Sequence, residues 1–202
     1  MYLEERFMNE IKGPEDAILN KIADVIAHFS REEQIEKQKT IENKLFEFAN
    51  FIEAERVFLY TGKYGEIHAE HIIEQALNLE KSVVVPVFTE LKNSVSLYRI
   101  NEFPSDLVEN DAGVLEPVPR KCKIAKPEEI DVAVIPGLVF DDKGGRIGFG
   151  DGWYKKLITQ LPETCRKISL AFEEQVVDQV QMDSRKHSVD IIITDKRIIY
   201  KI

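Results

Sequence analysis

Residues 132–154 read VAVIPGLVFDDKGGRIGFGDGWY, and this stretch decides the fold prediction. Its apolar start predicts a strand over residues 130–135, and a helix is predicted after it from Tyr154 to Leu161. Half of the chain's ten glycines lie between them, in residues 144–152. A strand, a glycine-rich loop and a helix in this order allow backbone N–H groups to bind a phosphate, and Arg146 adds a planar set of donors. The alternative is a solvated loop whose glycines serve tight turns.

Upstream of this stretch, apolar residues at helical spacing predict two helices. The first runs from Glu15 to Phe29, after an N-terminal arm of residues 1–14. Ser30 is followed three residues later by Glu33, the pattern of a capping box, and a second helix is predicted from there to about Ile52. Its predicted buried residues are Ile35, Ile41, Leu45, Phe48 and Ile52.

From residue 56 onward, short apolar runs alternate with helical segments. Strands are predicted at residues 56–60, 83–87, 95–100, 130–135, 167–172 and 189–194, with a helix at 69–79 and a terminal antiparallel hairpin over 197–202. This alternation predicts a three-layer α/β sandwich, a mostly parallel sheet flanked by helices, in a single domain over residues 1–202. Ligands of such folds bind at the carboxyl ends of the strands, where the loops 61–68, 86–94 and 136–154 are expected to meet.

The composition narrows the class of protein. A formal net charge of −9, from 36 acidic and 27 basic side chains, argues against nonspecific binding to nucleic acid or to anionic membranes. The two cysteines, Cys122 and Cys165, are far apart and predict neither a disulfide framework nor a zinc site. The N-terminal residues are charged and mixed, and no apolar run approaches the ~20 residues of a membrane span, so a cytoplasmic protein is expected.

The quoted stretch resembles the hallmark of one known family. A strand that ends in Pro136-Gly137 and continues to Phe140-Asp141, followed by residues 145–154, is similar to the hallmark of the 5-formyltetrahydrofolate cyclo-ligases (methenyltetrahydrofolate synthetases). Further similarities follow in collinear order over roughly residues 30–195: Tyr60 with the loop 65–67, then residues 83–86, 96–100, 113–117, 174–178 and 190–194.

The resemblance implies a cyclo-ligase fold of the CoA-transferase-like type and an enzyme that uses ATP and Mg²⁺ to close 5-formyltetrahydrofolate to 5,10-methenyltetrahydrofolate. Its implied partners are a small-molecule folate and a nucleotide, in a monomer or weak dimer. Catalytic roles fall on Arg146, Glu66 and Tyr154. The implied ATP-binding residues are Gly145, Arg146, Gly148, Phe149, Gly150, Asp151, Gly152, Trp153 and Tyr154. The implied folate-binding residues are Tyr60, Glu66, Pro86, Leu97, Trp153 and Tyr154.

Three departures from the family pattern concern charge. Lys155 and Lys186 stand where the resemblance implies acidic residues that help to hold Mg²⁺, and a lysine repels that cation. Glu15 and Leu19 stand where the family carries a basic pair that reaches the nucleotide. These changes predict weak binding of Mg²⁺ and weak or absent turnover. In one alternative the lysines replace the metal and bind an anionic ligand directly. In the other they are solvated charges at a helix edge on a family member that has lost catalysis. A non-catalytic binding or regulatory module is the alternative function.

Two further groupings of chemically active residues carry less weight. His68 and His71 are spaced for one helix face, but a convincing third zinc ligand is missing from the sequence pattern. His187, Ser188 and Asp190 are too close in sequence to form a catalytic triad. Asp141 is expected to orient the amides of a turn rather than to bind a metal.

Overall fold

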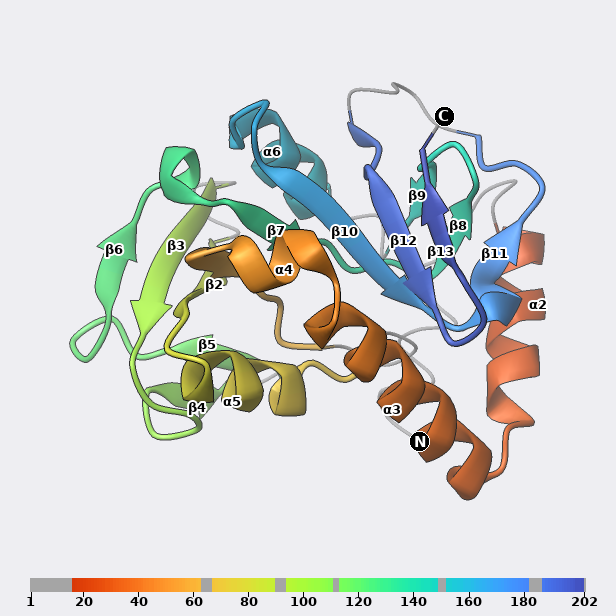
Figure 1. Ribbon diagram of the computed structural model, residues 1–202, viewed down its shortest axis with the longest axis horizontal. Helices are drawn as coiled ribbons and strands as arrows, with labels where there is room; N and C mark the ends of the chain where they lie inside the picture. The colour runs from red at the N-terminus through yellow and green to blue at the C-terminus, as the bar shows by residue number, and fades with distance from the viewer. Residues whose placement is uncertain are drawn as a thin grey trace.

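The computed structural model describes residues 16–62, 67–89, 94–110, 113–148, 152–181 and 187–201. Its central sheet has eight strands in the order β13-β12-β10-β7-β1-β2-β3-β6 (Figure 1). Strands β12, β10, β7, β1 and β2 pair in parallel. The edge strands β13 and β6, and β3 next to β6, pair antiparallel with their neighbours. Their bounds are Arg56–Phe58 (β1), Ser82–Thr89 (β2), Ser94–Ile100 (β3), Lys123–Ala125 (β6), Val132–Val134 (β7), Arg166–Ala171 (β10), Ile191–Thr194 (β12) and Ile198–Tyr200 (β13). The predicted parallel sheet and terminal hairpin are therefore confirmed.

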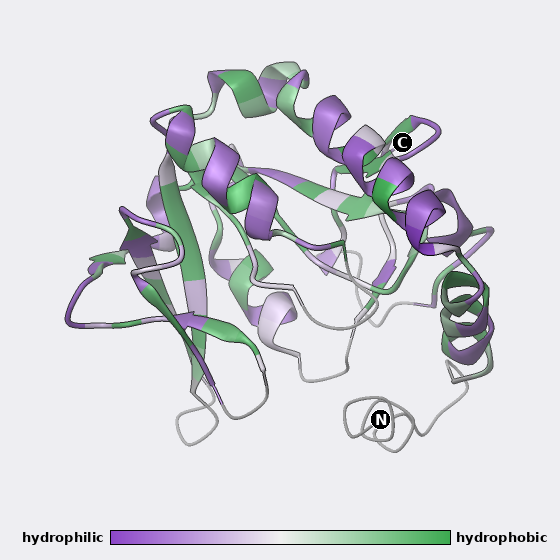
Figure 2. Ribbon diagram, turned by 90° about the horizontal axis from the view of Figure 1, so that it is seen from below, coloured by the Kyte–Doolittle hydropathy of each residue, from purple (hydrophilic) through white to green (hydrophobic). Residues whose placement is uncertain are grey.

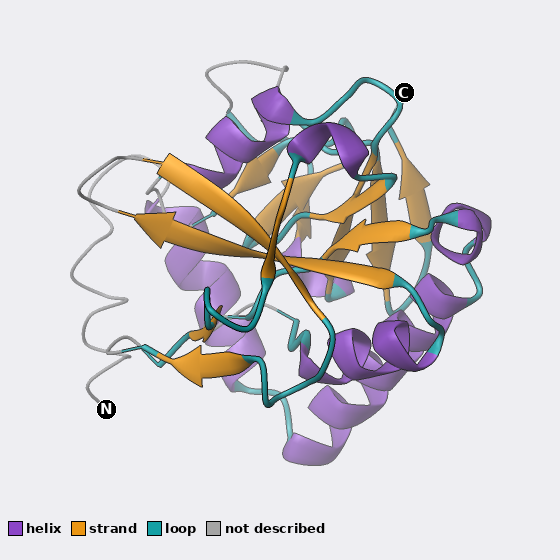
Figure 3. Cartoon of the chain, turned by 90° about the vertical axis from the view of Figure 1, so that its left-hand side faces the viewer, coloured by secondary structure: helices purple, strands orange, loops and turns teal. Residues whose placement is uncertain are grey.

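Helices cover both faces of this sheet (Figures 1 and 3). On one face lie α3 (Arg31–Phe46), α4 (Ala49–Glu53) and α5 (Glu70–Asn78), whose apolar residues share a core with Val83 and Val85 of β2. On the other face lies α6 (Trp153–Gln160), which shares a second core with Val84. Because neighbouring residues of a strand point to opposite faces, one continuous apolar run serves both cores. Figure 2 shows hydrophobic colour along the strands and on parts of the helices. The three-layer prediction is therefore confirmed.

The predicted second helix is correct at its start and wrong at its end. The Glu33 amide donates to Ser30 Oγ over 3.1 Å, which is the expected N-cap. The helix then stops at Phe46, and α4 begins separately after Phe48. Ile35 and Ile52 were expected to be buried, but they are 59% and 58% exposed. Ile35 lies six residues before the buried Ile41, about 240° around the helix, and the break rotates Ile52 away from the core.

The loop predicted between β7 and α6 contains a hairpin that the sequence reading missed. Strands β8 (Val139–Asp141) and β9 (Arg146–Ile147) pair antiparallel, and β11 (Val176–Val177) joins β8 in parallel. Gly144 forms the turn with a φ of 76°. The remaining elements are α2 (Asp16–Ala27), β4 (Leu107–Glu109) paired with β5 (Leu115–Pro117), and the short 3₁₀ helices η2 (Pro127–Glu129) and η3 (Glu173–Gln175). No helix within the described ranges is long and apolar enough to cross a membrane.

Candidate functional site

Three aromatic side chains from two elements form the centre of the candidate site. Phe88 lies near the carboxyl end of β2, while Trp153 and Tyr154 begin α6. The ring centroid of Phe88 is 5.6 Å from that of Trp153 and 5.3 Å from that of Tyr154. Phe58 of β1 is fully buried next to this group, and its ring centroid is 6.5 Å from that of Tyr154. Trp153 and Tyr154 were predicted for the site from the sequence, whereas Phe88 was missed because it follows the apolar run of β2 without any motif of its own.

Arg146 of β9 lies against this aromatic group. Its guanidinium carbon is 5.8 Å from the centroid of the Tyr154 ring, within the range of a cation–π contact. Its Nη1 donates to the carbonyl oxygen of Pro136 over 2.8 Å. A Cβ on Gly137 would stand 2.8 Å from Arg146 Cγ, so glycine is required for the arginine stem to pass. The structure thus brings Arg146 and Tyr154 together, as the sequence predicts.

The glycines of the quoted stretch serve different purposes at different positions. The Gly145 amide donates to Asp141 Oδ1 over 2.7 Å, so this N–H is used inside the hairpin. Gly148 lies directly beside Arg146, because a Cβ there would stand 2.8 Å from Arg146 Nη1. Gly152 is the N-cap of α6 with a φ of 72°, a left-handed conformation that favours glycine. Phe149, Gly150 and Asp151 lie outside the described residues.

The predicted folate-binding residues on the strands are largely buried. Tyr60 is 1% exposed, and its hydroxyl donates to the Ile67 carbonyl over 2.6 Å, which holds one end of the loop that carries Glu66. Pro86 and Leu97 are cross-strand partners in β2 and β3, and Leu97 is 3% exposed. Glu66 itself lies outside the described residues.

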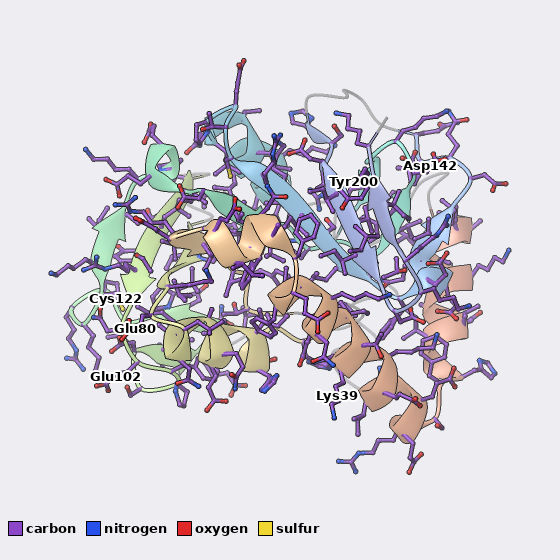
Figure 4. All side chains as sticks on the ribbon, in the orientation of Figure 1. Lys39, Glu80, Glu102, Cys122, Asp142 and Tyr200 are labelled. Atoms are coloured by element: carbon purple, nitrogen blue, oxygen red, sulfur yellow. The ribbon has the colours of Figure 1, made fainter. Side chains whose placement is uncertain are left out.

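Asp141 orients the turn, as expected. Its Oδ1 accepts from the amides of Lys143 and Gly145, and its Oδ2 accepts from the amide of Val180. The side chain is 3% exposed, whereas Asp142 next to it is exposed at the edge of the molecule (Figure 4). Both carboxylate oxygens of Asp141 are therefore committed to backbone groups.

The described residues at this site do not fit a magnesium ion held by the protein. Lys155 is half-buried in the first turn of α6, and Lys186 lies outside the described residues. Within the part of the chain that the structure describes, no three His, Cys, Asp or Glu side chains are grouped to hold a metal. His71 instead pairs with Glu42 at 2.7 Å. A hard cation needs anionic oxygens as ligands. Asp141 is the buried acid of this stretch among the described residues, and both of its carboxylate oxygens already accept hydrogen bonds from backbone amides.

A charged cluster that was not predicted from the sequence connects α3 to the segments that follow β10 and β12. Lys37 Nζ lies 2.9 Å from Glu174 Oε1 and 3.0 Å from Asp195 Oδ2. Burial alone would lower the pKa of Lys37, but the hydrogen bonds to both acids outweigh it and raise this pKa. Burial alone would likewise raise the pKa of Asp195, but hydrogen bonds from the Glu173 amide and from Lys37 lower it.

The N-terminal helix α2 is packed rather than extended toward a ligand. Leu19 is 4% exposed and joins Ile22 in a small core with Leu138, Val139 and Ile147 of the hairpin region. Leu19, at a position where the resemblance implies a basic residue, is therefore an apolar packing residue here. Glu15 lies outside the described residues.

The sequence and fold were compared with known proteins. The sequence model of the 5-formyltetrahydrofolate cyclo-ligase family matches residues 15–195. A probable 5-formyltetrahydrofolate cyclo-ligase of Caenorhabditis elegans is 27% identical over 95% of this chain and 98% of that protein. A probable 5-formyltetrahydrofolate cyclo-ligase of Schizosaccharomyces pombe is 25% identical over 96% of this chain and 98% of that protein. The structure of Aquifex aeolicus 5,10-methenyltetrahydrofolate synthetase superposes with a TM-score of 0.80 at 27% identity, covering 92% of each chain. A synthetase from Mycoplasma pneumoniae shares the fold, with a TM-score of 0.70 at 19% identity, covering 91% of this chain and 99% of that one.

Proposed function

Because the chain belongs to the 5-formyltetrahydrofolate cyclo-ligase family, we propose that it uses ATP to close 5-formyltetrahydrofolate to 5,10-methenyltetrahydrofolate. The observation that carries the proposal is the placement of Arg146 against Tyr154, at the half-buried start of α6. This group lies at the carboxyl end of β2, the edge at which ligands of parallel α/β folds bind. The comparisons favour this enzyme over a non-catalytic binding module. Its proposed location is the cytoplasm, as the sequence predicts.

The proposed reaction has two steps in which each bond made is balanced by a bond broken. The formyl oxygen of the folate attacks the γ-phosphorus of ATP, and ADP leaves. A folate N–H nitrogen then attacks the formyl carbon to close the ring and loses its proton to solvent, and the bond from that carbon to the phosphate oxygen breaks as phosphate leaves. Phosphoryl transfer of this kind depends chiefly on positioning and on neutralising the phosphate charge.

The residues of the chain divide these tasks by chemistry. Arg146 binds the transferring phosphoryl group, since its planar guanidinium presents several donors to phosphate oxygens. The amides at the start of α6, from Gly152 onward, add donors from a helix N-terminus. Glu66 orients the formyl group or a folate nitrogen. Phe88, Trp153 and Tyr154 present apolar ring surface to the planar heterocycle of folate or purine.

Magnesium has no protein ligands among the described residues of this site, so none of these steps is assigned to a protein-bound metal. A magnesium ion would enter on the phosphate oxygens of ATP, a common mode for this cation. Lys155, at the start of α6, places positive charge where the family has negative charge. Its ammonium is suited to bind a phosphate oxygen in place of metal.

A binding experiment tests the nucleotide half of the proposal. ATP that binds the native protein alone must raise its melting temperature. We expect this rise for the unchanged chain and a smaller rise in Arg146→Ala, which keeps the other phosphate donors but lacks the guanidinium. ADP release that requires 5-formyltetrahydrofolate tests the coupling of the two substrates. A protein that neither shifts with ATP nor releases ADP would contradict the proposal.

A further inference from the structure

The backbone that leaves β7 is held by side chains from three other elements. The carbonyl oxygen of Ile135 accepts from Ser169 Oγ over 2.7 Å. The carbonyl of Pro136 accepts from Arg146 Nη1 over 2.8 Å. The carbonyl of Leu138 accepts from Gln175 Nε2 over 2.9 Å. Ser169 comes from β10 and Gln175 from η3, so the two donors reach this segment from the strand beside β7 and from the 3₁₀ helix that follows that strand.

Ser169 and Gln175 are both fully buried, with no exposed side-chain surface. The amide of Phe172 donates to Gln175 Oε1 over 2.8 Å, which fixes the orientation of the glutamine and turns its nitrogen toward Leu138. Buried polar groups of this kind are costly when they lose a partner. Both side chains therefore hold the segment in one conformation.

The conformation of this segment determines where Arg146 can point. The proline ring limits the φ of Pro136, and the planar peptide bonds on either side leave few free torsions. The Leu138 amide also donates to the Ile147 carbonyl over 2.8 Å, which couples the segment to the strand that carries Arg146. With Ile135 and Leu138 held on both sides, the Pro136 carbonyl has one direction, and it is the acceptor for the guanidinium.

We propose that Ser169 and Gln175 are positioning residues for Arg146, acting through the carbonyl of Pro136. The inference deepens the proposed function and rests on it, because it assigns the arginine to the phosphates of ATP. Ser169 and Gln175 are fully buried beside residues 135–138, so their proposed role is to position Arg146 and not to contact the substrate. Their loss lets the Pro136 carbonyl turn, so that the guanidinium no longer faces the phosphate site.

The test is a double-mutant cycle on ATP affinity. Ser169→Ala removes one donor, and Gln175→Met removes the donor to Leu138 together with the acceptor for Phe172. Each is measured alone and combined with Arg146→Ala. The dissociation constants for ATP and for 5-formyltetrahydrofolate are read from the fluorescence of Trp153, the single tryptophan of the chain. Ser188→Ala is the control, since it also removes a buried hydroxyl, which accepts from Lys201 Nζ over 2.6 Å.

We expect each positioning variant to weaken ATP binding about tenfold, since small displacements at such sites have large effects, while folate binding changes by less than about twofold. In the Arg146→Ala background the same substitutions should change ATP binding by less than about twofold, because the residue they position is gone. An equal effect in both backgrounds would overturn the proposal and leave Ser169 and Gln175 with a purely structural role.

A crystal structure of the ligand-free Ser169→Ala protein provides a readout that does not depend on the proposed function. We expect the hydrogen bond from Arg146 Nη1 to the Pro136 carbonyl oxygen to be broken or to be longer than 2.8 Å. An unchanged bond would overturn the positioning role. Absence of ATP binding by the unchanged chain would instead count against the proposed function, so the two failures are distinguishable. If Ser169→Ala does not fold, Gln175→Met carries the same test.

Discussion

The rings of Phe88 and Trp153 face each other with centroids 5.6 Å apart and planes inclined by 36°. Sixty-five positions separate these residues in the chain, and only the approach of β2 to the start of α6 brings them together. Lys156 Nζ lies 5.2 Å from the centroid of the same tryptophan ring. This arrangement makes Trp153 both a candidate ligand contact and a fluorescent reporter of the site.

Phe88→Ala should weaken the binding of 5-formyltetrahydrofolate about tenfold, because it removes ring surface and the contacts to Trp153 and Tyr154. Titration of the folate against Trp153 fluorescence measures the effect. Tyr200→Ala is the control: this tyrosine on β13 is 58% exposed and contacts Phe48 instead (Figure 4). Equal weakening in both variants would remove Phe88 from the site.

Gly137→Ala should raise the KM for ATP about tenfold, because the added Cβ would stand 2.8 Å from both Arg146 Cγ and Phe140 Cζ. Steady-state kinetics with ATP varied measures this effect. Gly113→Ala is the control. Because Gly113 has a φ of 74°, this substitution should lower the free energy of unfolding by about 1 kcal/mol while leaving the KM for ATP unchanged. A normal KM in Gly137→Ala would show that the arginine stem does not need this glycine.

Asp195→Asn should make stability less sensitive to acid. The pKa of Asp195 is lowered in the folded protein, so its stabilising effect is present above the ordinary value of 3.8 and is lost as the pH falls through the folded value. At neutral pH we expect a loss of about 1–3 kcal/mol, since Lys37 and the Glu173 amide lose a charged partner. Denaturant titrations between pH 7 and about pH 3 measure the slope. Asp142→Asn, which removes a carboxylate at an exposed position, is the control.

The double variant Lys155→Asp with Lys186→Asp should make turnover more dependent on Mg²⁺. Two substitutions from lysine to aspartate move the local charge by about four units at neutral pH and supply oxygen ligands for a hard cation. Rates measured across a magnesium titration test this. Lys39→Asp places half of this change of charge, about two units, at an exposed position on α3 and serves as control (Figure 4). A double variant with the magnesium response of the unchanged chain would show that the lysines do not replace metal ligands.

The fold could be predicted from the sequence where the residues of one element are enough to indicate its structure and burial. The apolar run around Val84 serves cores on both faces and predicts a central strand without knowledge of its neighbours. The capping serine, Ser30, acts through a residue three positions away. The end of α3 was not predictable in this way, because Ile52 has a periodicity compatible with a longer helix and only the break near Phe48 turns it to solvent.

The candidate site was predictable where a local motif carries it, and not where distant residues complete it. Arg146 and Tyr154 lie in one motif and meet in the structure. Phe88, Ser169 and Gln175 reach the site or its support from other elements, through contacts whose sequence separations leave no periodic signal. A serine inside the apolar run of β10 was the available hint, since a buried hydroxyl requires a partner.

The most direct test of the central claim is turnover itself. Purified protein is mixed with ATP and 5-formyltetrahydrofolate, and the near-ultraviolet absorbance of the methenyl product is followed. We expect a rise that requires both substrates and that falls about 100-fold or more in Arg146→Ala, because the arginine neutralises the transferring phosphoryl group. A flat trace from well-folded protein, recorded while an active family member converts the same substrates, would contradict the assignment of cyclo-ligase activity to this chain.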